Sequence, residues 1–148
     1  GKNVSLEIIG STLSSEDVEY KRNLEVKIKS LSLADRVKFI DGVPHEEAIS
    51  KLKNYDVFVS ASKTGSLDKA VLEALGLGIP VVSTNEAFKY ILLPFRLFIE
   101  KGDSLAEGIK RAVSISETDR VELSKNIEKN HSLDRLIEII SKEIKSVF

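Results

Sequence analysis

The chain has 148 residues, 22 of them basic and 23 acidic, which gives a formal net charge of −1 at pH 7. This length predicts one domain, and the balanced charge lacks the basic excess typical of nucleic-acid binders. The sequence has no cysteine, which excludes thiol catalysis, disulfides and cysteine-bound zinc and fits a reducing, cytoplasmic compartment. No apolar run approaches the roughly 20 residues that a membrane span needs.

The sequence also has no methionine, and it begins at Gly1 directly before an apolar run from Val4 to Ile9. Because natural reading frames begin with methionine, we expect this chain to be a piece of a longer protein. A short protein that has lost its initiator methionine remains the alternative.

Short apolar runs bounded by turn residues predict strands. They cover residues 4–9, 37–40, 56–60, 80–83 and, as an edge strand, 97–99. Helical spacing of apolar residues fills the intervals. The expected helices cover residues 14–31, 45–53, 67–75, 103–113, 117–129 and 133–147. This alternation predicts an α/β fold, a three-layer α/β/α sandwich with helices on both faces of a mainly parallel sheet.

Two helices have clear boundary signals. Ser14 and Ser15 supply hydroxyl caps for the first helix. Its expected apolar face consists of Tyr20, Leu24, Ile28 and Leu31. The helix from Leu67 has the most regular spacing, with Leu67, Ala70, Val71, Ala74 and Leu75 on one face. Gly76 and Gly78 are expected to end this helix.

Ligands of open α/β sheets bind beyond the carboxyl ends of the strands. The corresponding loops cover residues 10–14, 41–45, 60–67 and 83–88. The third loop is rich in small and hydroxyl residues and leads into a helix, whose free N–H groups attract phosphate. Gly65 permits close approach of a ligand, Ser66 or Asp68 is suited to cap the helix, and Lys63 adds charge.

Glu73 lies farther along the same helix and has two interpretations. A carboxylate at this place is suited to bind vicinal ribose hydroxyls. It is equally suited to pair with Lys69, four residues earlier, as a surface ion pair of small energetic effect.

Other motifs carry no independent chemistry. Gly76-Leu77-Gly78 follows a helix instead of a strand, so it is interpreted as a helix end and not as a dinucleotide motif. There is no GxxxxGK[ST] phosphate loop, and His45 is interpreted as an exposed residue at a helix start. The sequence therefore shows no self-contained catalytic machinery.

Three segments resemble family-4 retaining glycosyltransferases, which have the GT-B fold. They are residues 33–44 (LADRVKFIDGVP), 53–62 (KNYDVFVSAS) and 67–83 (LDKAVLEALGLGIPVVS), and the resemblance extends in order from Val4 to Val113. It implies that residues 1–148 form the C-terminal, Rossmann-like, donor-binding domain. In that family this domain binds a UDP-, GDP- or ADP-sugar, usually without a metal, and no other cofactor is implied.

The resemblance also implies roles for individual residues. Glu73 matches the second of two glutamates eight residues apart and would bind the ribose. Gly42 and Val43 match the loop that meets the base. Backbone N–H groups of Gly65, Ser66 and Leu67 would face the sugar or the diphosphate. We include Gly10 because its loop follows the first strand.

This sequence departs from the family in two places. The first glutamate is replaced by Gly65, so Asp68 is our candidate for the missing catalytic carboxylate. The family's opening strand, with its Gly-Arg pair and a following lysine, is also missing, and by analogy with the Rossmann order this strand is central. Either residues 4–9 and 57–60 pair directly, or another chain fills the gap and allows a dimer through the incomplete sheet.

The resulting prediction is the donor-binding part of a hexosyltransferase that transfers a hexose from a nucleotide sugar to a sugar or lipid-linked acceptor. The acceptor-binding N-terminal domain would be missing, so we expect this chain alone to be inactive. The intact protein would be cytoplasmic or peripheral to the membrane. The alternatives are a Rossmann-like interaction module and a non-catalytic nucleotide-sugar-binding subunit.

Overall fold

The structure is a computed structural model that describes residues 4–62 and 65–147. The chain divides into two compact units, Gly1–Ala48 and Ile49–Phe148. Parallel strands alternate with helices in both, so the predicted α/β class is confirmed. No helix in these described ranges is long and apolar enough to cross a membrane.

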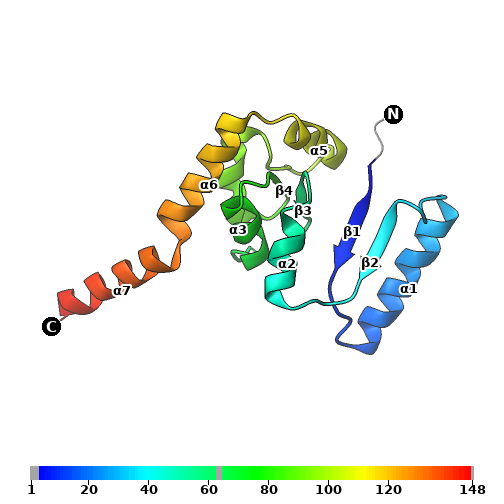
Figure 1. Ribbon diagram of the computed structural model, residues 1–148, viewed down its shortest axis with the longest axis horizontal. Helices are drawn as coiled ribbons and strands as arrows, with labels where there is room; N and C mark the ends of the chain where they lie inside the picture. Colours follow the sequence, from blue (N-terminus) through cyan, green and yellow to red (C-terminus); the bar gives the residue numbers. More distant parts are fainter. Residues whose placement is uncertain (1–3, 63–64, 148) are drawn as a thin grey trace. The chain divides into compact units, whose positions relative to one another are not determined.

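The first unit contains one parallel strand pair and a helix. Strands β1 (Leu6–Ile9) and β2 (Val37–Ile40) pair in register from Leu6 with Val37 to Ile9 with Ile40. Helix α1 (Ser15–Ser30) connects them and lies alongside the strands (Figure 1). The Lys21 ammonium lies 5.6 Å from the centre of the Phe39 ring, so α1 covers the face of the sheet that carries Phe39.

The predicted apolar face of α1 is only partly buried. Leu24 and Ile28 are half-buried, whereas Tyr20 is 66% exposed and Leu31 is 57% exposed, contrary to the prediction. The 16 residues of the helix span about 24 Å, but strands of four residues span only about 13 Å. The short strands therefore cover only part of the helix.

The start of α1 matches its sequence signal. Ser14 Oγ accepts a hydrogen bond from the Asp17 N–H at 3.1 Å, and Asp17 Oδ2 accepts from the N–H groups of Leu13 and Ser14, each at 3.0 Å. These bonds, the one from Leu13 first, lower the pKa of the Asp17 carboxyl below its ordinary value of 3.8. The ionised carboxylate is therefore the form that stabilises the helix start.

We expect Asp17→Asn to unfold at a lower urea concentration than the wild type at about pH 7. A carboxyl whose folded pKa is lowered stabilises the protein above its unfolded pKa, and this stabilisation disappears as the pH falls through the folded pKa. The two urea midpoints, measured by far-ultraviolet circular dichroism, should therefore converge at about pH 2. Equal midpoints at both pH values would contradict the expectation.

The second unit contains the remaining elements (Figure 1). Its helices and strands are α2 (His45–Leu52, which begins in the first unit), β3 (Phe58–Ser60), α3 (Lys69–Gly76), β4 (Val81–Ser83), α4 (Lys89–Leu92), α5 (Leu105–Val113), α6 (Glu117–His131) and α7 (Leu133–Val147). Two short 3₁₀ turns, η1 (Glu86–Phe88) and η2 (Leu93–Phe95), flank α4.

The strands form two sheets, in contrast to the single sheet of a complete sandwich. In the second unit β3 pairs with β4 in parallel, and the expected edge strand is reduced to a bridge between Ser83 and Phe98. Among the described residues, β1 pairs with β2 within the first unit and β3 pairs with β4 within the second. The alternative that residues 4–9 pair directly with residues 57–60 stays a prediction. That another chain fills the gap stays a prediction.

The end of α3 confirms the prediction for its two glycines. Gly78 has a φ of +76°. Its N–H donates to the carbonyl of Leu75, while the N–H of Ile79 donates to that of Ala74. This is the Schellman arrangement that glycine favours after a helix. Strand β4 begins at Val81, three residues after Gly78, so this turn directs the chain from α3 into the sheet.

Fully buried apolar residues of the second unit come from α3, β4 and the segments after it. The largest are Leu75, Phe88, Leu92, Leu97 and Leu123. Helices α3 and α6 pack side by side, and Ser124 Oγ donates to the carbonyl of Gly76 at 2.8 Å. On α7, by contrast, the aligned apolar side chains are 49% to 70% exposed. These are Leu133, Leu136, Ile137, Ile140 and Ile144.

Candidate functional site

The loops after β3 and β4 are brought together by the pairing of these strands. Ser60 pairs with Ser83, and each is the last residue of its strand. The N–H of Thr84 continues the contact by donating to the carbonyl of Ser60 at 3.1 Å. Two of the four loops that the sequence marked as ligand sites therefore start at the same edge of one sheet.

The described part of the loop after β3 has an exposed segment at Gly65, Ser66 and Leu67. Gly65 has a φ of +68°, and among the described residues, its chain neighbours aside, no heavy atom lies within 4 Å of the position that a Cβ would occupy. This backbone conformation favours glycine, and the space beside it leaves room for a ligand. Leu67 is 48% exposed, so its predicted place on the buried helix face is wrong.

Asp68 is the N-cap of α3, which begins at Lys69 and not at Leu67. Its backbone is extended, and its Oδ1 accepts a hydrogen bond from the Ala70 N–H at 3.1 Å. With Asp68 as the cap, α3 begins at Lys69, two residues after the predicted start at Leu67. The free N–H groups and positive dipole end of the helix therefore lie at Asp68 and the residues after it.

Two substitutions at Asp68 separate its capping role from any chemical role. Asparagine caps helices about as well as aspartate, so we expect Asp68→Asn to keep the wild-type free energy of unfolding. Asp68→Ala should lose about 1 kcal/mol, because the Ala70 N–H then has no side-chain acceptor. Urea denaturation measures both, and equal losses in the two variants would contradict the capping role.

Glu73 lies about one turn along α3, and its side chain is 21% exposed. Its Oε1 lies 3.4 Å from the Nζ of Lys69, whose side chain is 77% exposed. The ion pair considered from the sequence therefore forms. An ion pair whose lysine is largely exposed contributes little stability, so its presence is compatible with a further role for the carboxylate.

In the first unit, Gly10 and Gly42 follow the ends of β1 and β2. The Gly10 N–H donates to the carbonyl of Ile40 at 3.0 Å, and a Cβ at Gly42 would collide with the Ser11 hydroxyl. A glycine is thus required at position 42 while Ser11 keeps its place. Val43 beside it is half-buried. The structure therefore brings these three predicted residues to one end of this strand pair.

Comparison with known proteins identifies the family. The sequence family described as glycosyl transferases group 1 matches residues 1–131. The chain belongs to this family. Its structure also resembles sucrose-phosphate synthase from Thermosynechococcus elongatus, with a TM-score of 0.78 at 19% identity over 97% of this chain and 38% of that protein. The predicted Rossmann-like, C-terminal GT-B fold is thereby confirmed.

Two curated relatives of this group 1 glycosyltransferase chain share about a third of their aligned residues with it. A phosphatidylinositol N-acetylglucosaminyltransferase subunit from Arabidopsis thaliana is 32% identical over 98 residues, which is 64% of this chain and 22% of the relative. O-antigen biosynthesis glycosyltransferase WclY from Escherichia coli is 31% identical over 108 residues, again 64% of this chain and 30% of the relative. The chain therefore spans less than a third of either relative.

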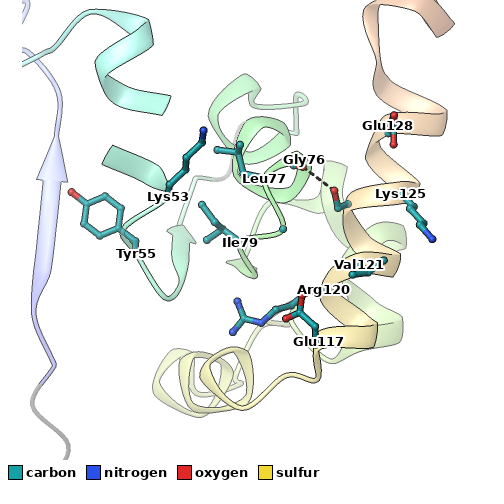
Figure 2. A pocket seen from close by; sticks show the side chains of 12 residues that line it. Lys53, Tyr55, Gly76, Leu77, Ile79, Glu117, Arg120, Val121, Lys125 and Glu128 are labelled. Atoms are coloured by element: carbon teal, nitrogen blue, oxygen red, sulfur yellow. Dashed lines mark hydrogen bonds between the residues drawn. The ribbon is translucent and has the colours of Figure 1, made fainter. Parts of the chain in front are cut away.

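A cavity of about 570 Å³ lies elsewhere on this group 1 chain (Figure 2). Tyr55 and Ile79, which line it, come before β3 and β4, so the cavity lies at the amino ends of these strands. Arg120 of α6 extends its guanidinium into this space. Its size suits a small ligand, but it is at the opposite end from the loops that parallel sheets use for binding.

The remaining predicted residue, Lys63, lies outside the described residues. One residue that the sequence interpretation missed is Asn85, whose side chain is fully buried beside the candidate loop. The sequence signal that could have indicated it is an amide residue two positions after a buried strand, within the loop 83–88.

Proposed function

We propose that this chain binds the nucleotide-sugar donor of a retaining hexosyltransferase. The match of residues 1–131 to the group 1 glycosyltransferases is the observation that carries the proposal. The loop after β3 supports it, because an exposed glycine-containing segment leads into the positive end of α3. A nucleoside diphosphate is the kind of anion that such a helix start attracts.

The proposed roles follow the positions of the predicted residues. Glu73 binds the ribose hydroxyls, and the backbone of Gly65, Ser66 and Leu67 faces the diphosphate or the sugar. In the first unit, Gly42 and Val43 meet the base and Gly10 leaves room beside them. No metal takes part in this scheme.

The proposed chemistry is electrostatic. Negative charge develops on the departing nucleoside diphosphate, and fixed N–H dipoles at the start of α3 stabilise it without having to reorient. Asp68 acts as the carboxylate that replaces the family's first glutamate. Its Oδ1 already holds the Ala70 N–H, so the carboxylate is fixed in place by the helix that it caps.

The acceptor is proposed to be a sugar or a lipid-linked glycan precursor. One relative is named for phosphatidylinositol and the other for O-antigen biosynthesis. We place the intact protein in the cytoplasm, peripheral to the membrane where such an acceptor is anchored. The acceptor-binding part belongs to a portion of the protein that this chain does not supply.

If this chain binds the donor and another portion of the protein binds the acceptor, the chain alone should bind a nucleotide but transfer no sugar. The test incubates the chain with UDP-, GDP- and ADP-sugars and an octyl glycoside acceptor, and measures nucleotide affinity by calorimetry and sugar transfer by mass spectrometry. We expect one nucleotide to bind and no glycoside to gain a sugar. Transfer above the level of a heat-denatured control would contradict the assignment to donor binding alone.

A non-catalytic donor-binding subunit is the second candidate, and Gly65 favours it. This glycine stands where the family has a glutamate, and its positive φ disfavours any side chain there. Adding the missing acceptor-binding part distinguishes the two candidates. Transfer that is lost in Asp68→Asn supports the enzyme, whereas nucleotide binding without any transfer in the assembled protein supports the subunit.

A further inference from the structure

Asn85, the second residue after β4, has a fully buried polar side chain. Two other buried polar residues, Ser60 and Ser83, lie at the carboxyl ends of β3 and β4. A buried amide is costly unless its donors and acceptor are hydrogen-bonded. The partners of Asn85 therefore indicate why a polar residue is placed there.

The Asn85 amide group connects two loops. Its Nδ2 donates to the carbonyl of Ser66 at 2.9 Å and to Ser62 Oγ at 3.3 Å. Its Oδ1 accepts from the Ala87 N–H at 3.0 Å, which caps η1. The Ser66 carbonyl only accepts and the Ala87 N–H only donates, so these two partners fix the orientation of the amide.

Thr84, the residue before Asn85, also forms a hydrogen bond to the loop after β3. The hydroxyl of Thr84 donates to the carbonyl of Ser62 at 3.3 Å. Thr84 and Asn85, the two residues after β4, thus form hydrogen bonds to the loop after β3 at Ser62 and at Ser66. The place of the loop depends on residues about 20 positions later in the sequence, and not only on the helix that follows it.

Capping alone does not explain the choice of asparagine. Aspartate or serine at an N-cap would accept from the Ala87 N–H equally well. Neither the aspartate carboxylate nor a single hydroxyl could donate to both Ser66 and Ser62. The Nδ2 group is therefore the part of the side chain that requires another explanation.

We propose that Asn85 is a positioning residue that fixes the backbone of Ser66, and with it the segment Gly65–Leu67, in the conformation that receives the nucleotide-sugar diphosphate. This inference rests on the proposed donor-binding function. A loop held before the ligand arrives loses less conformational freedom on binding, which strengthens binding. Asn85 itself touches no ligand in this scheme.

The test compares Asn85→Asp with Ser83→Ala. The first variant keeps the acceptor for Ala87 and removes both donors to the loop. The second removes another buried hydrogen bond of the same residue, from the Asn85 N–H to Ser83 Oγ at 3.0 Å, and leaves the Asn85 donors to Ser62 and Ser66 in place. The readouts are ¹⁵N relaxation at the amides of Ser66 and Leu67, and nucleotide affinity by calorimetry.

In Asn85→Asp we expect the order parameters of Ser66 and Leu67 to fall from about 0.85 to below about 0.6, while those of α3 stay unchanged. Nucleotide affinity should fall about tenfold, as expected for the loss of one or two hydrogen bonds. Ser83→Ala should keep wild-type loop order and affinity. If Asn85→Asp does not fold, Thr84→Val, which removes only the Thr84 hydroxyl, should lower the same order parameters.

Unchanged loop order in Asn85→Asp, or an equal loss in Ser83→Ala, would overturn the proposal. The relaxation measurement needs no nucleotide. A wild-type chain that binds no nucleotide therefore contradicts the donor-binding function, while the relaxation data still decide whether Asn85 holds the loop.

Discussion

Replacement of Glu73 by alanine is expected to weaken the binding of UDP or GDP by about 10- to 100-fold. Hydrogen bonds from ribose hydroxyls to a carboxylate are charge-assisted, and such bonds contribute about 1.5 to 3 kcal/mol. The side chain is 21% exposed, so it is partly shielded from water yet accessible from outside. Isothermal titration calorimetry with each nucleotide measures the effect.

Lys69→Ala is the matched control for this substitution. It removes the other member of the ion pair, whose nitrogen lies 3.4 Å from Glu73 Oε1, and leaves the carboxylate in place. If Glu73 binds ribose, the lysine variant should bind nucleotide within about fivefold of wild type, because an ion pair with a largely exposed lysine contributes under about 1 kcal/mol. Equal nucleotide affinities in the wild type and Glu73→Ala would contradict ribose binding by Glu73 and leave it only the ion pair with Lys69.

Leu75→Ala should lower the free energy of unfolding of the second unit by about 2 to 5 kcal/mol. The side chain is fully buried in α3, and its removal leaves a cavity between the helix and its neighbours. Leu77, two residues later, is 38% exposed, so Leu77→Ala should cost less than about 1 kcal/mol. Urea unfolding compares the two, and similar losses would contradict the assigned core.

Signals confined to a few neighbouring residues were predicted well. The Ser14 cap of α1 depends on Asp17, three residues away, and the turn at Gly78 depends on carbonyls of the helix just before it. Such hydrogen bonds are determined by residue types at fixed short spacings. Sequence alone therefore located these helix ends and the short strands between the helices.

Features that depend on distant residues were predicted less well. The Asn85 bonds join positions 19 and 23 residues apart, so no local pattern indicates them. Burial on α1 was overestimated because helical spacing indicates which side chains share a face but not how far the covering sheet extends. The start of α3 was misplaced because both Ser66 and Asp68 are good caps, and only the structure shows that Asp68 is the one that caps.

The candidate site was predicted in outline and not in detail. Strand order indicated the loops after β3 and β4, because parallel strands bring their carboxyl ends together. The structure places Gly65, Ser66, Leu67, Asp68 and Glu73 in one loop and the helix that follows it. Their roles toward a nucleotide sugar are proposals that the family membership motivates.

Titration of the ¹⁵N-labelled chain with UDP and GDP, followed by amide chemical shifts, tests whether a nucleotide binds at the loop after β3 and the start of α3. We expect one nucleotide to shift the amides of Ser66, Leu67, Asp68 and Glu73 in a saturable way. Absence of shifts with either nucleotide, or shifts confined to the cavity around Arg120 and Ile79 at the opposite end of the strands, would contradict it.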